Sequence, residues 1–429
     1  MKENWYDVLI IGAGASGLMA ALELVQTGKK IAIVEARNRV GGRIHTASDN
    51  RFSIPLEMGA EFVHGNLELT QLLLKKANAK YFRLSGDMWQ SEKGRLQKQE
   101  DFIEDYSELE KKFKELKEDI PVAEFIKQSL QGKPYEDLRT TLQNYVEGYY
   151  AADTARASTK ALCEELATSD DEQYRIDGGY KSLVDYLCRE AEQKGCFFFL
   201  SQPVEKIYWS ENAADVKTVS HTFSATKVLI TVPLGILQSE QILFSPAIDE
   251  KINAAQQLGF GPVIKTILQF KNAFWKNTDF TGNHDLDHLS FLFSKEEVPT
   301  WWTQYPKDVA LLTGWLGGPN AEAVKHHNEE EILNKALGSL QSIFNVDLSY
   351  LRQHIQAACV ANWATDPYNR GGYAYEVVNG PAIRKTLKEP EANTLFFAGE
   401  ALYDGPEIGT VEAALVSGRD TAHRIIASF

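Results

Sequence analysis

Cysteine is scarce in this chain of 429 residues, and its sequence has no long apolar run. The four cysteines show no C-x-x-C spacing, which disfavours a metal centre or a disulfide framework, so we predict no metal site. No apolar run approaches the roughly 18 residues of a transmembrane helix. The first apolar segment begins almost at Met1 and leaves no room for a signal peptide. These absences predict a soluble, cytoplasmic protein without a membrane partner.

Positive charge is in deficit: 45 Lys and Arg face 59 Asp and Glu, for a formal net charge of −14. This balance argues against nucleic acid as a partner and favours the attraction of a cationic small molecule. The sequence also shows no Ser/His/Asp set that would indicate nucleophilic catalysis. The length favours two or three domains, at about 150 residues each.

The first fifty residues carry the clearest pattern. Residues 7–11 form an apolar run rich in β-branched side chains, which predicts a buried parallel strand. Residues 12–17 follow and fit G-x-G-x-x-G. The Ala- and Leu-rich segment after them predicts a helix ended by Gly28, and residues 31–34 predict a second strand that ends on Glu35. This order predicts a βαβ unit that binds a dinucleotide.

Each glycine of the motif has a separate physical role. Gly12 permits a tight turn, Gly14 lets the backbone approach a pyrophosphate, and Gly17 lets helix and strand pack closely. The helix N-terminus offers free N–H groups to phosphate, and Glu35 stands where an acid can hydrogen-bond ribose hydroxyls. We therefore assign to the dinucleotide site Gly12, Gly14, Ala15, Ser16, Gly17 and Glu35.

A second Gly pair lies beside arginines at residues 39–43. It suggests another close approach to phosphate, with Arg43 as a guanidinium clamp, which NAD-dependent dehydrogenases do not need. The stretch from Glu35 to Arg43 resembles the flavin-containing amine oxidase family, which includes polyamine and monoamine oxidases. The resemblance implies FAD and adds these residues to its site: Ala36, Arg37, Gly42, Arg43, Gly59, Ala60, Glu61, Val204, Gly399, Glu400, Thr410 and Val411.

Lys265 lies inside an apolar strand pattern, where a lysine is costly to bury unless it has a use. Gly259 and Gly261 precede it at the spacing of the family. By this resemblance Lys265 matches the lysine that holds a water against flavin N5, which makes it a candidate catalytic residue. The alternative is an edge-strand lysine whose ammonium reaches solvent.

Residues 363–375 are the second stretch that resembles the family. Tyr373 matches one of the two tyrosines that flank the flavin in monoamine oxidases, and we take it as the second candidate catalytic residue. The other tyrosine position is Thr410, which resembles polyamine oxidases instead. Monoamine oxidases attach FAD through a cysteine where this chain has Gly372, so we expect FAD to bind non-covalently.

Three residues are predicted to contact the substrate: His64, Trp363 and Thr410. His64 matches a position beside the substrate in polyamine oxidases, and a loop histidine without a role is the alternative. Trp363 can contact an amine by packing or a cation–π interaction, and plain core is its alternative.

Residues 67–175 are charged, poor in glycine and helical in pattern. One apolar stripe follows helical spacing, which indicates an intramolecular core face more often than a partner surface. Residues 329–344 predict a further amphipathic helix. The stripe consists of Phe102, Tyr106, Leu109, Phe113 and Leu116.

The resemblance implies an α/β protein, α+β overall. It has a discontinuous, doubly wound FAD-binding domain and a substrate domain of mixed β-sheet and helices. We predict that the FAD-binding domain comprises residues 1–72, 177–248 and 367–429. The substrate domain then comprises residues 73–176 and 249–366.

The implied function is FAD-dependent oxidation of a polyamine or related amine. A hydride passes from the α-carbon to flavin N5, the imine is hydrolysed, and O2 reoxidises the flavin to give H2O2. The partners are a small-molecule amine and O2, and the protein is a monomer or homodimer. An L-amino-acid oxidase is one alternative, and it would need Arg83, Arg139 or Arg370 for the carboxylate. A desaturase- or protoporphyrinogen-oxidase-like enzyme is another, and a non-catalytic FAD-bound protein that uses the stripe as its interface is the last.

Overall fold

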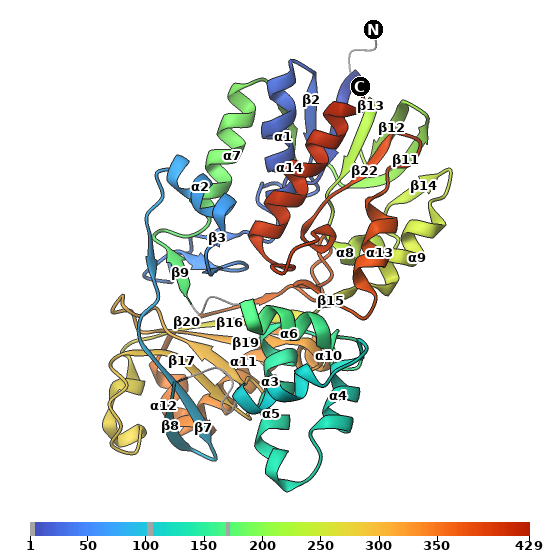
Figure 1. The fold of residues 1–429 in the computed structure, drawn as a ribbon. Helices are drawn as coiled ribbons and strands as arrows, with labels where there is room; N and C mark the ends of the chain where they lie inside the picture. Colours follow the sequence, from blue (N-terminus) through green and yellow to red (C-terminus); the bar gives the residue numbers. More distant parts are fainter. Residues whose placement is uncertain (1–4, 101–105, 169–171) are drawn as a thin grey trace.

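The computed structural model describes residues 5–100, 106–168 and 172–429, and the chain forms two lobes that are each built on a large sheet (Figure 1). Within these ranges no helix is both long and apolar enough to cross a membrane. The predicted α/β class is confirmed, because mixed sheets and helices make up both lobes.

In the described residues the first sheet joins eight strands in the order β10-β2-β1-β13-β12-β11-β14, with β22 beside β13. β1 pairs in parallel with β2 and β13, as expected for apolar runs buried on both faces. Helices α1, α7 and α14 pack together on one face of this sheet (Figure 1). The bounds are β1 Trp5–Ile11, α1 Ala15–Leu24, β2 Ile31–Val34, α7 Lys181–Gln193, β10 Phe197–Phe199, β11 Val204–Ser210, β12 Ala213–Thr218, β13 Thr222–Ile230, β14 Leu243–Ser245, β22 Leu395–Phe397 and α14 Val411–Ala427.

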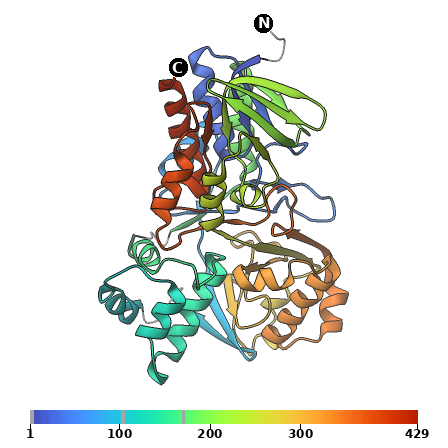
Figure 2. The ribbon, with the colours of Figure 1, turned by 90° about the vertical axis from the view of Figure 1, so that its right-hand side faces the viewer.

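The second sheet has seven strands within the same described ranges, in the order β20-β16-β19-β18-β17-β7-β8. Figure 2 shows the helices of residues 106–168 on one side of this lobe and α11 and α12 on the other. The bounds are β7 Asp87–Glu92, β8 Arg95–Gln99, α3 Tyr106–Lys114, α4 Val122–Ser129, α5 Glu136–Asn144, α6 Thr159–Thr168, β16 Val263–Phe270, β17 Leu289–Ser294, β18 Thr300–Trp302, β19 Leu311–Gly317, α11 Glu329–Phe344, α12 Leu348–His354 and β20 Ile355–Asn362.

Smaller elements connect the two sheets. A π-helical turn follows α5 directly and forms part of the cavity described below. The remaining bounds are β3 Thr46–Ala47, β4 Leu56–Glu57, β5 Phe62–His64, α2 Glu68–Lys76, β6 Tyr81–Arg83, the π-turn Tyr145–Tyr149, β9 Gln173–Ile176, α8 Leu234–Gln238, α9 Asp249–Gln257, β15 Gly259–Gly261, α10 Gly318–Val324, β21 Tyr373–Tyr375 and α13 Gly380–Lys388.

The helical prediction for residues 67–175 is wrong in part, because this block contains β6, β7, β8 and β9. β7 and β8 form a hairpin closed by Lys93 and Gly94, whose φ angles of 50° and 74° are both left-handed. A two-residue turn of this kind is typical of hairpins, and its Lys-Gly sequence is a weaker signal than Asn-Gly. The helical periodicity of the rest of the block concealed the hairpin.

Other predicted elements are confirmed. Helix α11 has the predicted bounds and begins with a capping box between Asn328 and Glu331. Gly28 is left-handed, with a φ of 74°, where the first helical segment ends. Every strand of the first sheet comes from the segments predicted to bind FAD, although the domain boundaries themselves stay a prediction.

The predicted stripe packs inside the protein. Leu109 and Phe113, on α3, are buried in a core cluster that also contains Phe125, and Tyr106 and Leu116 pack against it. Phe102 lies outside the described residues. The four described residues of the stripe are therefore core, as their spacing favoured, and they do not form an exposed interface.

Candidate functional site

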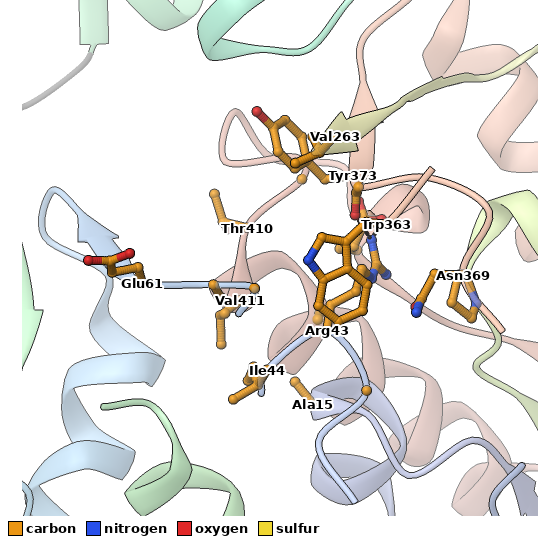
Figure 3. Close-up of a pocket in the computed structure, with 18 of the residues that line it drawn as sticks. Ala15, Arg43, Ile44, Glu61, Val263, Trp363, Asn369, Tyr373, Thr410 and Val411 are labelled. Carbon is orange, nitrogen blue, oxygen red and sulfur yellow. Dashed lines mark hydrogen bonds and ion pairs between the residues drawn. The ribbon is translucent and has the colours of Figure 1, made fainter. Parts of the chain in front are cut away.

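A cavity of about 900 Å³ lies between the two sheets and takes lining residues from both. Every residue predicted for the cofactor or substrate site lines it, except Gly17. Figure 3 shows Tyr373 and Thr410 on one side of this space and Ala15 on the other, with Arg43 and Trp363 between them. The fold therefore brings the scattered predicted residues together, while the ligand that each of them binds stays a prediction.

The glycine-rich turn has the geometry that its sequence requires. Gly12 has a φ of +106°, which an L side chain rarely adopts. A Cβ at Gly17 would lie 2.0 Å from the Gly12 carbonyl oxygen. Gly17 therefore allows α1 to pack closely against the turn, and it does not line the cavity. A Cβ at Gly14 would meet no atom within 4 Å and would point into open space.

The start of α1 fits the phosphate groups of a dinucleotide. Ser16 is 4% exposed, and its hydroxyl is a buried group without a hydrogen-bond partner in the described structure. The N-cap residue, Gly14, has no side chain to bond the first N–H groups of the helix. A buried hydroxyl and uncapped amides beside a cavity are the donor set that an anion requires.

Glu35 ends β2 and is 6% exposed. Its two carboxylate oxygens accept hydrogen bonds from the amides of Ala13 and Arg37, at 2.7 and 2.8 Å. Burial raises the pKa of this carboxyl group, against the lowering effect of the two amides. Each oxygen keeps a second lone pair, so the predicted contact with a ribose hydroxyl is compatible with this arrangement.

Arg43 holds protein groups together rather than standing free as a phosphate clamp. Its Nη1 donates to Glu400 Oε1 at 2.7 Å and to the Gly372 carbonyl at 2.8 Å. Glu400 also accepts from the Ala374 amide at 3.3 Å. Arg37 pairs with Asp366 in the same way. Both arginines thus join the N-terminal segment to residues 366–400 across the cavity.

Lys265 is 1% exposed on β16, an interior strand between β19 and β20. The edge-strand interpretation is therefore wrong. Its Nζ donates to Glu61 Oε2 at 2.7 Å, to the Glu57 carbonyl at 2.6 Å and to the Gly59 carbonyl at 3.2 Å. An ammonium has three hydrogens, and these three acceptors match them. A water can be held by Lys265 only in place of one of these contacts.

Glu61, predicted to bind the cofactor, uses its carboxylate for protein groups. Besides Lys265, it accepts from Arg175, Trp302 and Gln304. Burial by itself would raise the pKa of Glu61, yet the charges of Lys265 and Arg175 hold it below its ordinary value. The acid therefore stays ionised inside the protein.

Tyr373 forms an aromatic wall of the cavity. Its ring stacks on Trp315 with centroids 6.2 Å apart and planes 19° apart, and its hydroxyl donates to the Tyr149 carbonyl. Burial raises the pKa of this phenol, so it stays protonated. Trp363 is 7% exposed and donates from Nε1 to the Met58 carbonyl at 2.7 Å, so it is both core and lining.

Two further predicted residues are ordered by local contacts. His64 Nδ1 lies 3.1 Å from the Tyr149 hydroxyl, and burial lowers the pKa of this imidazole to about 4. His64 is therefore neutral at physiological pH. Thr410 is the N-cap of α14, and its hydroxyl oxygen accepts from the Ala413 amide, as Ser and Thr caps do.

Sequence analysis missed the residues at the far end of the cavity. Tyr145 and Tyr149 stack with centroids 5.2 Å apart in the π-turn, a local geometry that often marks functional sites. Glu165, from α6, lines the same end. Burial raises the pKa of this carboxyl group to about 7. The sequence offered one sign of this aromatic end, because three tyrosines lie between residues 145 and 150 within a charged block.

Comparisons with known proteins agree with this geometry. Residues 15–426 match a family described as flavin containing amine oxidoreductase. The chain is 28% identical to polyamine oxidase 2 of Arabidopsis thaliana in an alignment of 462 positions, which covers 99% of this chain and 90% of that protein. It is also 28% identical to lysine-specific histone demethylase 2 of Homo sapiens, over 98% of this chain and 53% of that protein.

Solved structures show the same fold. A triple mutant of putrescine oxidase matches with a TM-score of 0.80 and 21% identity, over 99% of each chain. Cyclohexylamine oxidase from Brevibacterium oxydans matches with a TM-score of 0.79 and 20% identity, over 98% of this chain and 99% of that chain.

The family match spans almost the whole chain, and the predicted family and enzyme class are confirmed. The protein belongs to the flavin-containing amine oxidoreductases, and it is an oxidoreductase that acts on amines with a flavin cofactor.

Proposed function

We propose that this protein oxidises a polyamine or a related di- or triamine with non-covalently bound FAD. A bound flavin would supply the acceptor for the hydride of the amine α-carbon and would let the electrons pass to O2, which would become H2O2. The residues of the chain orient the C–H bond, exclude water and hold the charges around it. A cytoplasmic location and a monomeric or dimeric state remain predictions.

One observation carries the proposal. The cavity is continuous from the uncapped start of α1, past Lys265 and Tyr373, to Glu165 at the aromatic end. A dinucleotide fits the first part because of its phosphate donors, and an amine fits the second because of its aromatic rings and carboxylate. The negative charge of Glu165 reaches Tyr373, where it adds to the effect of burial in raising the pKa of the phenol.

FAD, as opposed to another flavin, is supported by the dinucleotide turn at Gly12 and by Val204, which lines the cavity near its nucleotide end. Non-covalent binding is supported at position 372, where monoamine oxidases carry a cysteine. A Cβ on Gly372 would lie 2.5 Å from Val263 Cγ2, so a cysteine has no room there.

The substrate class is supported by the names of relatives. Polyamine oxidase 2 and putrescine oxidase are named for polycationic amines. The L-amino-acid oxidase alternative lacks its recognition group, because Arg83, Arg139 and Arg370 do not line the cavity. The arginines that do, Arg37 and Arg43, are bound to Asp366 and Glu400.

The function is tested with purified, yellow protein. Acid precipitation should release the flavin into the supernatant, and flavin retained in the pellet would contradict non-covalent binding. Under anaerobic conditions, spermine, N-acetylspermine, primary monoamines and L-amino acids are each mixed with the enzyme. Bleaching by the polyamines above the others supports the proposal, whereas bleaching by L-amino acids alone overturns it.

Glu165→Gln should raise the KM for spermine by about 10- to 100-fold, because it removes one charge-assisted hydrogen bond to an ammonium group. Since the pKa of Glu165 is raised to about 7, its ionised form appears as the pH rises through 7. The wild-type KM should therefore fall between pH 6 and 8, and the variant should lose this dependence. Steady-state kinetics at several pH values measures both effects.

Glu164→Gln is the matched control, because Glu164 is the exposed neighbour on α6 and does not line the cavity. Its KM and pH dependence should equal those of the wild type. An unchanged KM for spermine in Glu165→Gln would remove Glu165 from substrate binding.

A further inference from the structure

Three charged side chains meet beneath the wall of the cavity: Glu61, Lys265 and Arg175, which we call the Glu61 cluster. Their side chains are 5%, 1% and 7% exposed. They come from distant parts of the chain, because Lys265 is on β16, Arg175 is on β9, and Glu61 lies between β4 and β5. The cluster itself holds two cations and one carboxylate, and the nearby Glu57 carboxyl group, whose pKa burial raises to about 7, adds at most a partial negative charge at neutral pH.

The carboxylate of Glu61 is saturated by donors. Oε2 accepts from Lys265 Nζ at 2.7 Å, and Oε1 accepts from Arg175 Nη2 at 3.1 Å. Two neutral donors complete the shell of Oε1, and they are Trp302 Nε1 at 3.1 Å and Gln304 Nε2 at 3.3 Å. A buried carboxylate with this many donors stays ionised and has one position.

Lys265 depends on Glu61 for its counter-charge. Its other two acceptors are backbone carbonyls, which carry only partial charge. A buried ammonium without a full counter-charge is costly to maintain, and the third member of the cluster, Arg175, is a cation. The other acid that acts on Lys265 is Glu57, and burial raises the pKa of its carboxyl group to about 7, so it is only partly ionised at neutral pH. Glu61 is therefore the acid that pairs directly with Lys265, while the two carbonyls keep the ammonium in the same place.

We propose that Glu61 is a positioning residue for amine oxidation, which holds the Lys265 ammonium at the cavity wall. By balancing one of the two buried cations, Glu61 sets how much positive charge this wall retains. The inference rests on the proposed action of Lys265 on the flavin. Positive charge at this wall would stabilise the electron-rich reduced flavin. The size of this stabilisation depends on how many charges the cluster retains.

The experiment measures the midpoint potential of the bound flavin in Glu61→Gln and Lys265→Met, with chemical reduction in place of an amine. Glu61→Gln removes a negative charge and should raise the potential, whereas Lys265→Met removes a positive charge and should lower it. Opposite shifts are the signature of a shared charge cluster. Structural damage alone would not give shifts of opposite sign, so shifts in one direction, or none in Glu61→Gln, overturn the proposal.

Reoxidation by O2 supplies the second measurement. Glu61→Gln should slow reoxidation by about tenfold, in the range that residues supporting a functional group usually show. The double variant Glu61→Gln/Lys265→Met should match Lys265→Met within about twofold, because Glu61 acts through the lysine. Additive losses would mean that Glu61 acts independently and would overturn the positioning role.

Glu376→Gln is the matched control, since it removes a half-buried carboxylate that pairs with the buried Arg384, and neither residue lines the cavity. It should leave the potential and the reoxidation rate unchanged. If Glu61→Gln does not retain flavin, Glu61→Asp takes its place, because aspartate keeps the negative charge but its shorter side chain holds the carboxylate farther from Lys265. A near-wild-type potential with slowed reoxidation then supports the proposal, and a wild-type reoxidation rate overturns it.

These measurements separate the inference from the proposed function. Chemical reduction needs no substrate, so the opposite shifts remain measurable even if no amine bleaches the flavin. Bleaching by polyamines with shifts in one direction would instead retain the proposed function and remove the role of Glu61.

Discussion

Gly17→Ala is expected to unfold the nucleotide-binding turn and abolish flavin binding. The added Cβ would lie 2.0 Å from the Gly12 carbonyl oxygen and 2.9 Å from Thr231 Oγ1, so α1 would have to move away from β1. Overpacking of a tight contact costs about 3 kcal/mol, and here the helix that carries the phosphate donors is displaced. Thermal unfolding of the apoprotein and fluorescence titration with FAD measure the two losses.

Gly14→Ala separates binding from folding. Gly14 has a φ of −76° and a ψ of −179°, which alanine adopts readily, and a Cβ there meets no atom within 4 Å. The apoprotein should keep its wild-type stability. The methyl group would occupy the space that the pyrophosphate needs, so FAD affinity should fall by about 30-fold, or ~2 kcal/mol.

Gly338→Ala, on α11, provides the control, because its Cβ also meets no atom within 4 Å and it does not line the cavity. This change should leave FAD affinity intact and raise stability by up to about 1 kcal/mol. Wild-type FAD affinity in Gly14→Ala would show that the pyrophosphate does not approach this turn.

Lys265→Met should slow reoxidation of the reduced flavin by about 100-fold, the size expected when one preorganised charge is removed from a buried site. FAD affinity should change by less than about threefold, because the predicted phosphate donors lie elsewhere in the cavity. Stopped-flow mixing of reduced enzyme with O2 measures the first, and fluorescence titration measures the second.

The protein should tolerate this substitution. Methionine has a similar length, and Glu61 keeps Arg175, Trp302 and Gln304 as partners, so no charge loses its last partner. Lys251→Met is the control, since Lys251 is 4% exposed and pairs with Glu391 but does not line the cavity. Unchanged reoxidation in Lys265→Met would remove this lysine from the oxidative half of the reaction.

The predictions succeeded where a short segment determines its own geometry. The βαβ unit, the stop at Gly28 and the bounds of α11 depend on contacts a few residues apart, and the structure has all three. The hairpin of β7 and β8 was missed because β7 is held in the sheet by pairing with β17, about two hundred residues further along the chain, and within the described residues β8 pairs only with β7. Strand patterns are weaker than helical ones for this reason.

The same division holds within the site. By itself, the sequence determined the family, through the motifs around Gly12, Lys265 and Gly372, and these motifs predicted which residues carry its chemistry. It did not reveal that Glu61 binds Lys265, because 204 positions separate the two residues. It also did not bring Glu165 and the tyrosines of the π-turn to the end of the same cavity.

Only the tertiary structure decided these contacts. The free energy of a buried charge depends on which groups surround it, and those groups are chosen by packing between the two sheets rather than by order along the chain. The sequence determined the family, the flavin and the catalytic candidates. The fold decided which side chains hold them in place.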